Sequence, residues 1–184
     1  SASLVGSEMC IRDSREAALG LADAAKERRD NMAEKIARVV EIINRPENKD
    51  EHFLLWHDLE SEREALCKAI PGCKAVYGSQ DDEEADKGIA DFKNGRLKYL
   101  AAKPEMLGEG LNFQYHCHKA IMFIDYRFND KFQAIARIYR FMQKHPVDLY
   151  LVYAESEGEI FKSFMQKWAQ HREMVSKMTD IAVS

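Results

Sequence analysis

The sequence predicts an α/β fold, a three-layer domain built on a mainly parallel five-stranded sheet. Short apolar runs such as residues 53–56 and 120–124 lack polar–apolar alternation, which is typical of parallel strands covered on both faces. Segments with helical periodicity lie between these runs, and strands that alternate with helices indicate right-handed crossovers. A chain of 184 residues with 46% apolar content can bury one core. We therefore expect one domain with an appended helix.

The first 48 residues are expected to add little to the sheet. Residues 3–14 resemble the translation of a transposase-based sequencing adapter, so residues 1–14 are predicted to be an artefact and disordered, and the natural protein to extend upstream of Arg15. Residues 15–48 are predicted to form an N-terminal helix that packs on the domain, with a coiled coil as the alternative. Its apolar positions recur at steps of three and four, at Met32, Ile36, Val39, Val40 and Ile43.

Residues 49–184 carry the predicted domain. Polar residues that could cap helices, in the spacing of a capping box, stand at Ser61 with Glu64 and at Ser156 with Glu159, and Ser79 with Asp82 is a further candidate cap. The helix after the first of these is expected to end near Ile70, before Pro71-Gly72. The five predicted strands are residues 53–56, 74–77, 97–102, 120–124 and 148–153.

Composition and charge limit the setting of the chain. It has no apolar run of about 18 residues and no signal-peptide core, which predicts a cytoplasmic location and no membrane partner. The spacing of the four cysteines predicts reduced, structural thiols, with metal binding by His116, Cys117 and His118 as the alternative. The formal charge is −4, but residues 98–145 carry +4, a distribution compatible with a phosphate-facing surface.

The candidate site follows from the rule that ligands bind at the carboxyl ends of parallel strands. That rule places Gly78 and Ser79, the loop of residues 103–114 and residues 125–129 along one edge of the sheet. Arg137 and Arg140, at positions i and i+3 of the next helix, would present two guanidinium groups on neighbouring parts of one face. Two planar, permanently charged groups suit a polyphosphate.

Several ordered motifs give the chain a recognisable resemblance. From about His52 to Phe164 it resembles the second RecA-like domain of superfamily two helicases, and within them the Swi/Snf-like DNA translocases, including those of phages and bacteria. This resemblance implies that the cytoplasm is that of a bacterial or phage-infected cell. Trp-His-Asp at residues 56–58 is similar to motif four, and Gly78-Ser79 and residues 92–95 match the segment after it. Residues 108–114 match motif five, and residues 133–143 match motif six, usually Q-x-x-x-R-x-x-R-x-G-Q.

The resemblance implies roles for these residues. Arg137 and Arg140 would be arginine fingers that reach the γ-phosphate of ATP held, with Mg²⁺, by a partner RecA-like domain. The family pattern is broken by Met142 in place of glycine, by Glu109 and by Ala136. The remaining implied contacts are to ATP from Gly108, Gly110, Asn112, Gln114 and Gln133, and to the DNA backbone from Gly78, Ser79 and Lys103.

The sequence contains neither a G-x-x-x-x-G-K-[ST] loop nor an Asp-Glu pair after an apolar strand. We therefore expect half an active site: the chain alone should lack ATPase activity, whereas a parent protein with an N-terminal RecA-like domain should hydrolyse ATP when duplex DNA is present. Two alternatives stay open, a non-catalytic α/β module that docks nucleic acid or protein, and an RNA helicase of the DEAD-box kind. Gln133, where that group has histidine, favours the DNA branch.

Overall fold

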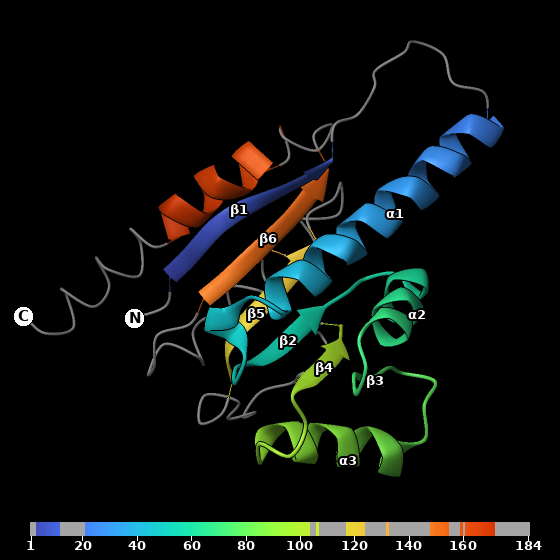
Figure 1. Cartoon of the computed structure of the whole chain (residues 1–184), viewed down its shortest axis with the longest axis vertical. Helices are drawn as coiled ribbons and strands as arrows, with labels where there is room; N and C mark the ends of the chain where they lie inside the picture. The colour runs from blue at the N-terminus through green and yellow to red at the C-terminus, as the bar shows by residue number, and fades with distance from the viewer. Residues whose placement is uncertain are drawn as a thin grey trace, which may run out of the picture.

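The computed structural model describes residues 3–11, 21–103, 106, 117–123, 132, 148–154, 159 and 161–171. Within these residues, six strands form one sheet in the order β1-β6-β5-β2-β4-β3, and every adjacent pair is parallel (Figure 1). The predicted α/β class is confirmed. The strands are β1 (Ser3–Ile11), β2 (His52–Trp56), β3 (Lys74–Val76), β4 (Tyr99–Ala102), β5 (Cys117–Phe123) and β6 (Asp148–Ala154).

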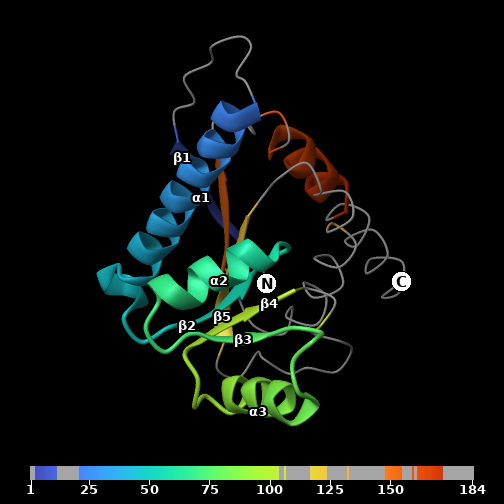
Figure 2. The same ribbon diagram turned by 90° about the vertical axis from the view of Figure 1, so that its right-hand side faces the viewer.

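Helices cover both faces of the sheet. The described helices are α1 (Leu21–Ile43), the 3-10 turn η1 (Pro46–Asn48), α2 (Glu60–Ala69), α3 (Asp82–Lys93) and a helical segment at residues 161–171. In Figure 2 the strands β1, β5 and β6 lie between α1 on one side and the segment 161–171 on the other. None of the helices in the described part of the chain has an apolar stretch long enough to cross a bilayer.

The two faces of the sheet enclose two separate cores, because successive side chains of a strand point in opposite directions. Phe53 and Leu55 of β2 pack with the apolar residues of α1 and α2. Leu54 and Trp56 pack instead with those of α3 and of the segment 161–171. All four side chains are at most 4% exposed. The unbroken apolar run of β2 is therefore explained by burial on both faces.

The structure adds one strand that the sequence interpretation left out. Residues 3–11, expected to be disordered, form β1 and pair with β6, with Ser3 opposite Asp148 and Met9 opposite Tyr153. The disorder prediction differs from the structure because it rested on an adapter-like string of letters and not on strand propensity. An apolar segment with Leu4, Val5 and Ile11 can pair with the free backbone groups that β6 would otherwise present at the end of the sheet.

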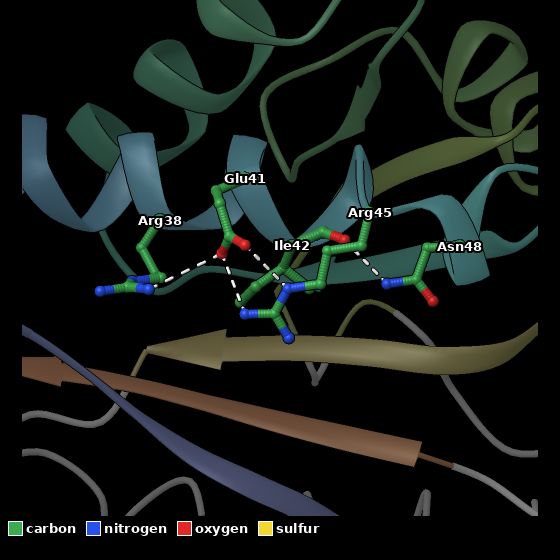
Figure 3. A network of polar contacts seen from close by, with 5 residues as sticks. All are labelled: Arg38, Glu41, Ile42, Arg45 and Asn48. Atoms are coloured by element: carbon green, nitrogen blue, oxygen red, sulfur yellow. Dashed lines mark hydrogen bonds and ion pairs between the residues drawn. The ribbon is translucent and has the colours of Figure 1, made fainter.

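Asn48 links the end of α1 to β5, and Figure 3 shows its contact with Ile42 of α1. Its buried side chain donates a hydrogen bond from Nδ2 to the carbonyl oxygen of Ile42 at 2.7 Å, and its Oδ1 accepts one from Nζ of Lys119 in β5. Near it, Arg45 donates from Nε and Nη2 to the two carboxylate oxygens of Glu41, both at 2.9 Å. The hydrogen bond from Arg45 lowers the pKa of Glu41.

Candidate functional site

Three strands end level with one another at one edge of the sheet, which we call the carboxyl edge. The register places Trp56 of β2 and Val76 of β3 both beside Ala102 of β4. The residues that follow these strands, His57, Tyr77 and Lys103, therefore leave the sheet at the same edge. The predicted placement of Gly78, Ser79 and Lys103 at this edge agrees with the structure.

Gly78 and Ser79 lie at the exposed tip of a turn between β3 and α3. Gln80 closes the turn, because its backbone N–H donates to the Tyr77 carbonyl oxygen at 3.2 Å and its side-chain Oε1 accepts from the Tyr77 N–H at 3.3 Å. A Cβ atom added at Gly78 would meet nothing within 4 Å. Among the described residues, packing thus gives no reason for a glycine here, and the space above it is open to a ligand.

The predicted helix caps are shifted in the structure. Asp81, not Ser79, is the N-cap residue of α3, and it makes no side-chain capping hydrogen bond. At the start of α2, Glu62 replaces the predicted Ser61–Glu64 pair: its carboxylate accepts hydrogen bonds from the backbone N–H groups of Leu59 at 2.8 Å and Asp58 at 3.4 Å. Glu62 is 3% exposed, so this cap holds the first turn of α2 at the carboxyl edge.

Lys103 supplies a half-buried positive charge at the end of β4. Beside it, the backbone N–H of His57 donates to the Ala102 carbonyl oxygen at 3.2 Å, which continues the pairing of β2 with β4 by one residue. The His57 ring is buried, and neither of its nitrogens has a hydrogen-bond partner among the described residues. Burial, and then the charges of Lys103 and Arg63, lower the pKa of His57 to about 4. His57 is therefore neutral at pH 7.

Arg63 is an edge residue that the sequence interpretation missed. Its guanidinium carbon lies 3.7 Å from the centre of the Tyr77 ring, and its Nη2 lies 2.6 Å from Oε1 of Glu60. Glu64 is a second, more distant ion-pair partner at 3.9 Å. The only sequence signal was an arginine in the first turn of a helix and an aromatic residue directly after a strand. Because Arg63 is already paired with carboxylates, Lys103 is the better candidate for binding an anion.

The nucleotide-facing residues of the sequence interpretation lie outside the described part of the chain. These are Gly108, Gly110, Asn112, Gln114, Gln133, Arg137 and Arg140, together with Glu109, Ala136, Met142 and residues 125–129. Two described residues flank them. Met106 packs against the core on the α3 face, and the ring of Phe132 is 9% exposed and lies 5.8 Å from that of Phe164 and 6.2 Å from that of Trp168.

The metal alternative also falls largely outside what the structure describes, since His116 and the side chains of Cys117 and His118 are not included. Among the residues that are included, no group of three or more histidine, cysteine or acidic side chains comes together. The described carboxyl edge offers Lys103 and the Ser79 hydroxyl, two groups that suit an anion.

Three solved structures with a similar fold are C-terminal parts or domains of larger proteins. The structure of the C-terminal part of the Fun30 ATPase domain matches with a TM-score of 0.57 and 17% identity, over 70% of this chain and 44% of that chain. The C-terminal domain of S. cerevisiae Dbp5, bound to Gle1 and IP6, matches with a TM-score of 0.61 and 18% identity. This match covers 76% of this chain and 80% of that chain. The Sulfolobus solfataricus SWI2/SNF2 ATPase C-terminal domain matches with a TM-score of 0.52 and 16% identity. This match covers 73% of this chain and 56% of that chain.

No family model and no curated protein matches the sequence. At 16–18% identity, the structural matches show the fold, which is that of a RecA-like α/β domain. The chain spans 44% of the Fun30 structure that it matches.

Proposed function

We propose that this chain is the second motor half of an ATP-dependent DNA helicase or translocase, and that it works against a first RecA-like domain that holds ATP and Mg²⁺. The level carboxyl ends of β2, β3 and β4 carry the proposal, because they bring Gly78, Ser79 and Lys103 to one edge. The likeness of the fold to the C-terminal parts of ATPase domains supports it.

The DNA backbone is proposed to lie along the carboxyl edge. Lys103 offers the positive charge, and the open space at Gly78 lets a phosphate approach the backbone N–H groups of the turn. The first turn of α3 carries Asp82, Glu83 and Glu84, all exposed. Because these carboxylates repel phosphate, the path of the backbone should run on the β4 side of Ser79, away from α3.

The nucleotide is proposed to meet the segment that begins after Phe132. The buried Phe132 ring, directly before that segment in the sequence, packs against Phe164 and Trp168. Arg137 and Arg140 then act as arginine fingers, which stabilise the charge of the transferring phosphoryl group only when the two domains close. Gly108, Gly110, Asn112, Gln114 and Gln133 link this nucleotide contact to the DNA contact.

The DNA part of the proposal can be tested with the chain itself. Removing the charge of Lys103 with Lys103→Gln should weaken binding to a labelled DNA duplex several-fold and reduce the slope of log K against log salt by about 0.9, the loss of one phosphate contact. Fluorescence anisotropy at several salt concentrations measures both quantities.

Lys68→Gln is the matched control, because it removes the same charge from an exposed lysine in the last turn of α2, at the other edge of the sheet. Its affinity and salt slope should stay close to those of the unchanged chain. Equal losses for the two variants would mean that overall charge, not the carboxyl edge, binds the DNA.

The nucleotide part needs the parent protein with its first domain. Arg137→Ala should lower kcat for ATP hydrolysis by about 10³ or more while DNA binding is retained. The 184-residue chain alone should show no appreciable ATPase activity, and DNA-stimulated turnover by these residues would contradict the half-site proposal.

The same measurements separate the alternatives. For a non-catalytic docking module, Arg137→Ala would weaken binding but leave hydrolysis per bound complex unchanged. For an RNA helicase half, RNA would stimulate hydrolysis more than DNA does. Gln133, in place of the histidine of DEAD-box-like helicases, favours the DNA reading.

A further inference from the structure

Two cysteines lie against each other at the sheet edge opposite the carboxyl edge. Cys67 belongs to the last turn of α2, and Cys73 directly precedes β3. Their Sγ atoms are 3.9 Å apart, and both side chains are half-buried against the core on the α1 and α2 face. A disulfide bond is about 2.05 Å long, so the two sulfur atoms need to approach by about 1.9 Å, a change within the reach of side-chain rotation.

The connection between α2 and β3 builds this proximity into the fold. The Ile70 N–H donates to the Leu66 carbonyl oxygen at 3.0 Å and ends the helix, and the Cys73 N–H donates to the Ile70 carbonyl oxygen at 3.2 Å. Gly72 takes the left-handed conformation that this turn needs, with φ of 79°. Because Ile70 is 1% exposed, the turn is anchored in the core and returns Cys73 to the side of Cys67.

The surroundings give the two thiols different roles. The hydrogen bond between the two thiols lowers the pKa of Cys67, and the positive charges of Arg63 and Lys74 lower it further. The same hydrogen bond, together with burial, raises the pKa of Cys73. Cys67 is therefore the thiolate former of the pair, and Cys73 is the thiol that keeps its proton.

We propose that Cys67 and Cys73 form an oxidisable dithiol that a peroxide converts, reversibly, to a disulfide. The Cys67 thiolate attacks one peroxide oxygen, the O–O bond breaks, and the departing hydroxide takes up a proton to become water, which leaves a sulfenic acid on Cys67. The Cys73 sulfur then attacks the Cys67 sulfur. The S–S bond forms, the S–O bond breaks, and the second water carries away the Cys73 proton. Two thiols are oxidised, hydrogen peroxide is reduced to two waters, and a thiol reductant reverses the change.

The disulfide would tie the last turn of α2 to the start of β3. It would close a short loop around Ile70, Pro71 and Gly72 and so restrict the unfolded chain more than the folded one. This inference does not depend on the proposed helicase function, because it concerns only the described contacts of α2 and β3.

The test uses the reduced 184-residue chain, treated with hydrogen peroxide, blocked with iodoacetamide and digested with trypsin. Cleavage after Arg63, Lys68 and Lys74 separates the two cysteines into residues 64–68 and 69–74. The expected product is these two peptides joined, about 2 Da lighter than their sum, and split again by dithiothreitol. The joined peptides should form faster in the folded chain than in guanidinium, and the oxidised chain should unfold at a higher temperature than the reduced one.

Matched variants assign the effect to this pair. Cys10→Ser with Cys117→Ser should leave the joined peptides unchanged, whereas Cys73→Ser should abolish them and leave Cys67 to oxidise further. Cys67→Ala gives a second loss-of-pair variant if Cys73→Ser folds poorly. The proposal is overturned if peroxide leaves both peptides separate in the folded chain, or joins them only after denaturation.

Discussion

His57 lies in an environment far from that of a free side chain. It is 2% exposed, neither ring nitrogen has a partner among the described residues, and Lys103 and Arg63 both oppose its protonation. A buried neutral imidazole at the edge where ligands are proposed to bind has one direct consequence. Stability must depend on pH in a window set by this residue.

The direction in which stability changes with pH follows from the protonation of His57 in the unfolded and folded chain. Unfolded His57 binds a proton near pH 6.5, whereas folded His57 stays neutral down to about pH 4. The contribution of His57 to stability is therefore complete above pH 6.5, falls as the pH drops from 6.5 to about 4, and falls no further below that. The loss should not exceed about 3 kcal/mol. Denaturant titrations at several pH values should show this loss of unfolding free energy in the unchanged chain and a smaller loss in His57→Gln. An equal dependence of the unfolding free energy on pH in the two proteins would contradict the role of His57.

Asn48 should matter more to stability than the ion pair beside it. Asn48→Ala removes hydrogen bonds to the Ile42 carbonyl and the Lys119 ammonium in a buried position, which should cost about 1–3 kcal/mol. Arg45→Gln breaks an exposed pair with Glu41 and should cost less than about 1 kcal/mol. Unfolding in denaturant compares the two variants, and a larger loss for Arg45→Gln would refute this ranking.

At the residue scale the sequence identified Gly78, Ser79 and Lys103, and it identified His57 through the likeness to motif four, but it identified neither Arg63 nor Glu62. Gly78, Ser79 and Lys103 follow predicted strands, so the rule for parallel sheets located them. Arg63 and Glu62 act through contacts that no local pattern encodes. Arg63 reaches Tyr77 across two segments that are not adjacent in sequence, and Glu62 caps a helix that begins earlier than predicted.

At the scale of elements, periodicity and turn residues were informative. The helix expected to end near Ile70 does so, with Ile70 as the C-cap of α2 and Gly72 at φ of 79°. Strand boundaries agree within a few residues, because each strand is an apolar run bounded by polar or turn residues. The strand β1 was missed since its pairing depends on a free edge of β6, which is a property of the folded sheet.

Two glycines in neighbouring elements should respond in opposite directions to alanine. Gly88→Ala places a Cβ at 3.5 Å from Cγ2 of Val76, an ordinary contact, and should stabilise α3 by about 1 kcal/mol through helix propensity. Gly72→Ala forces alanine to φ of 79° and should destabilise the chain by about 1–2 kcal/mol. Thermal unfolding measures both. A loss of stability in Gly88→Ala would show that α3 packs more tightly than the structure indicates.

At the scale of the whole molecule, the class of fold could be predicted but the order of strands could not. All five predicted strands are apolar runs of similar length, so nothing in the sequence distinguishes central from outer positions. In the structure β2 is central, the chain moves to β3 at one end of the sheet, and β4 returns between them. That order places the turn of Gly78 and Ser79 at the same edge as Lys103, although Ser79 and Lys103 are 24 positions apart in the sequence.

The central claim is that the carboxyl edge of the sheet binds the nucleic-acid backbone, and amide hydrogen exchange tests it most directly. Exchange would be followed in the 184-residue chain with and without duplex DNA. DNA should slow exchange in residues 77–80 and at Lys103, at the carboxyl edge, and leave residues 70–74 and 94–98, at the opposite edge, unchanged. Protection confined to the opposite edge, or none in residues 77–80 and at Lys103 at saturating DNA, would contradict the claim.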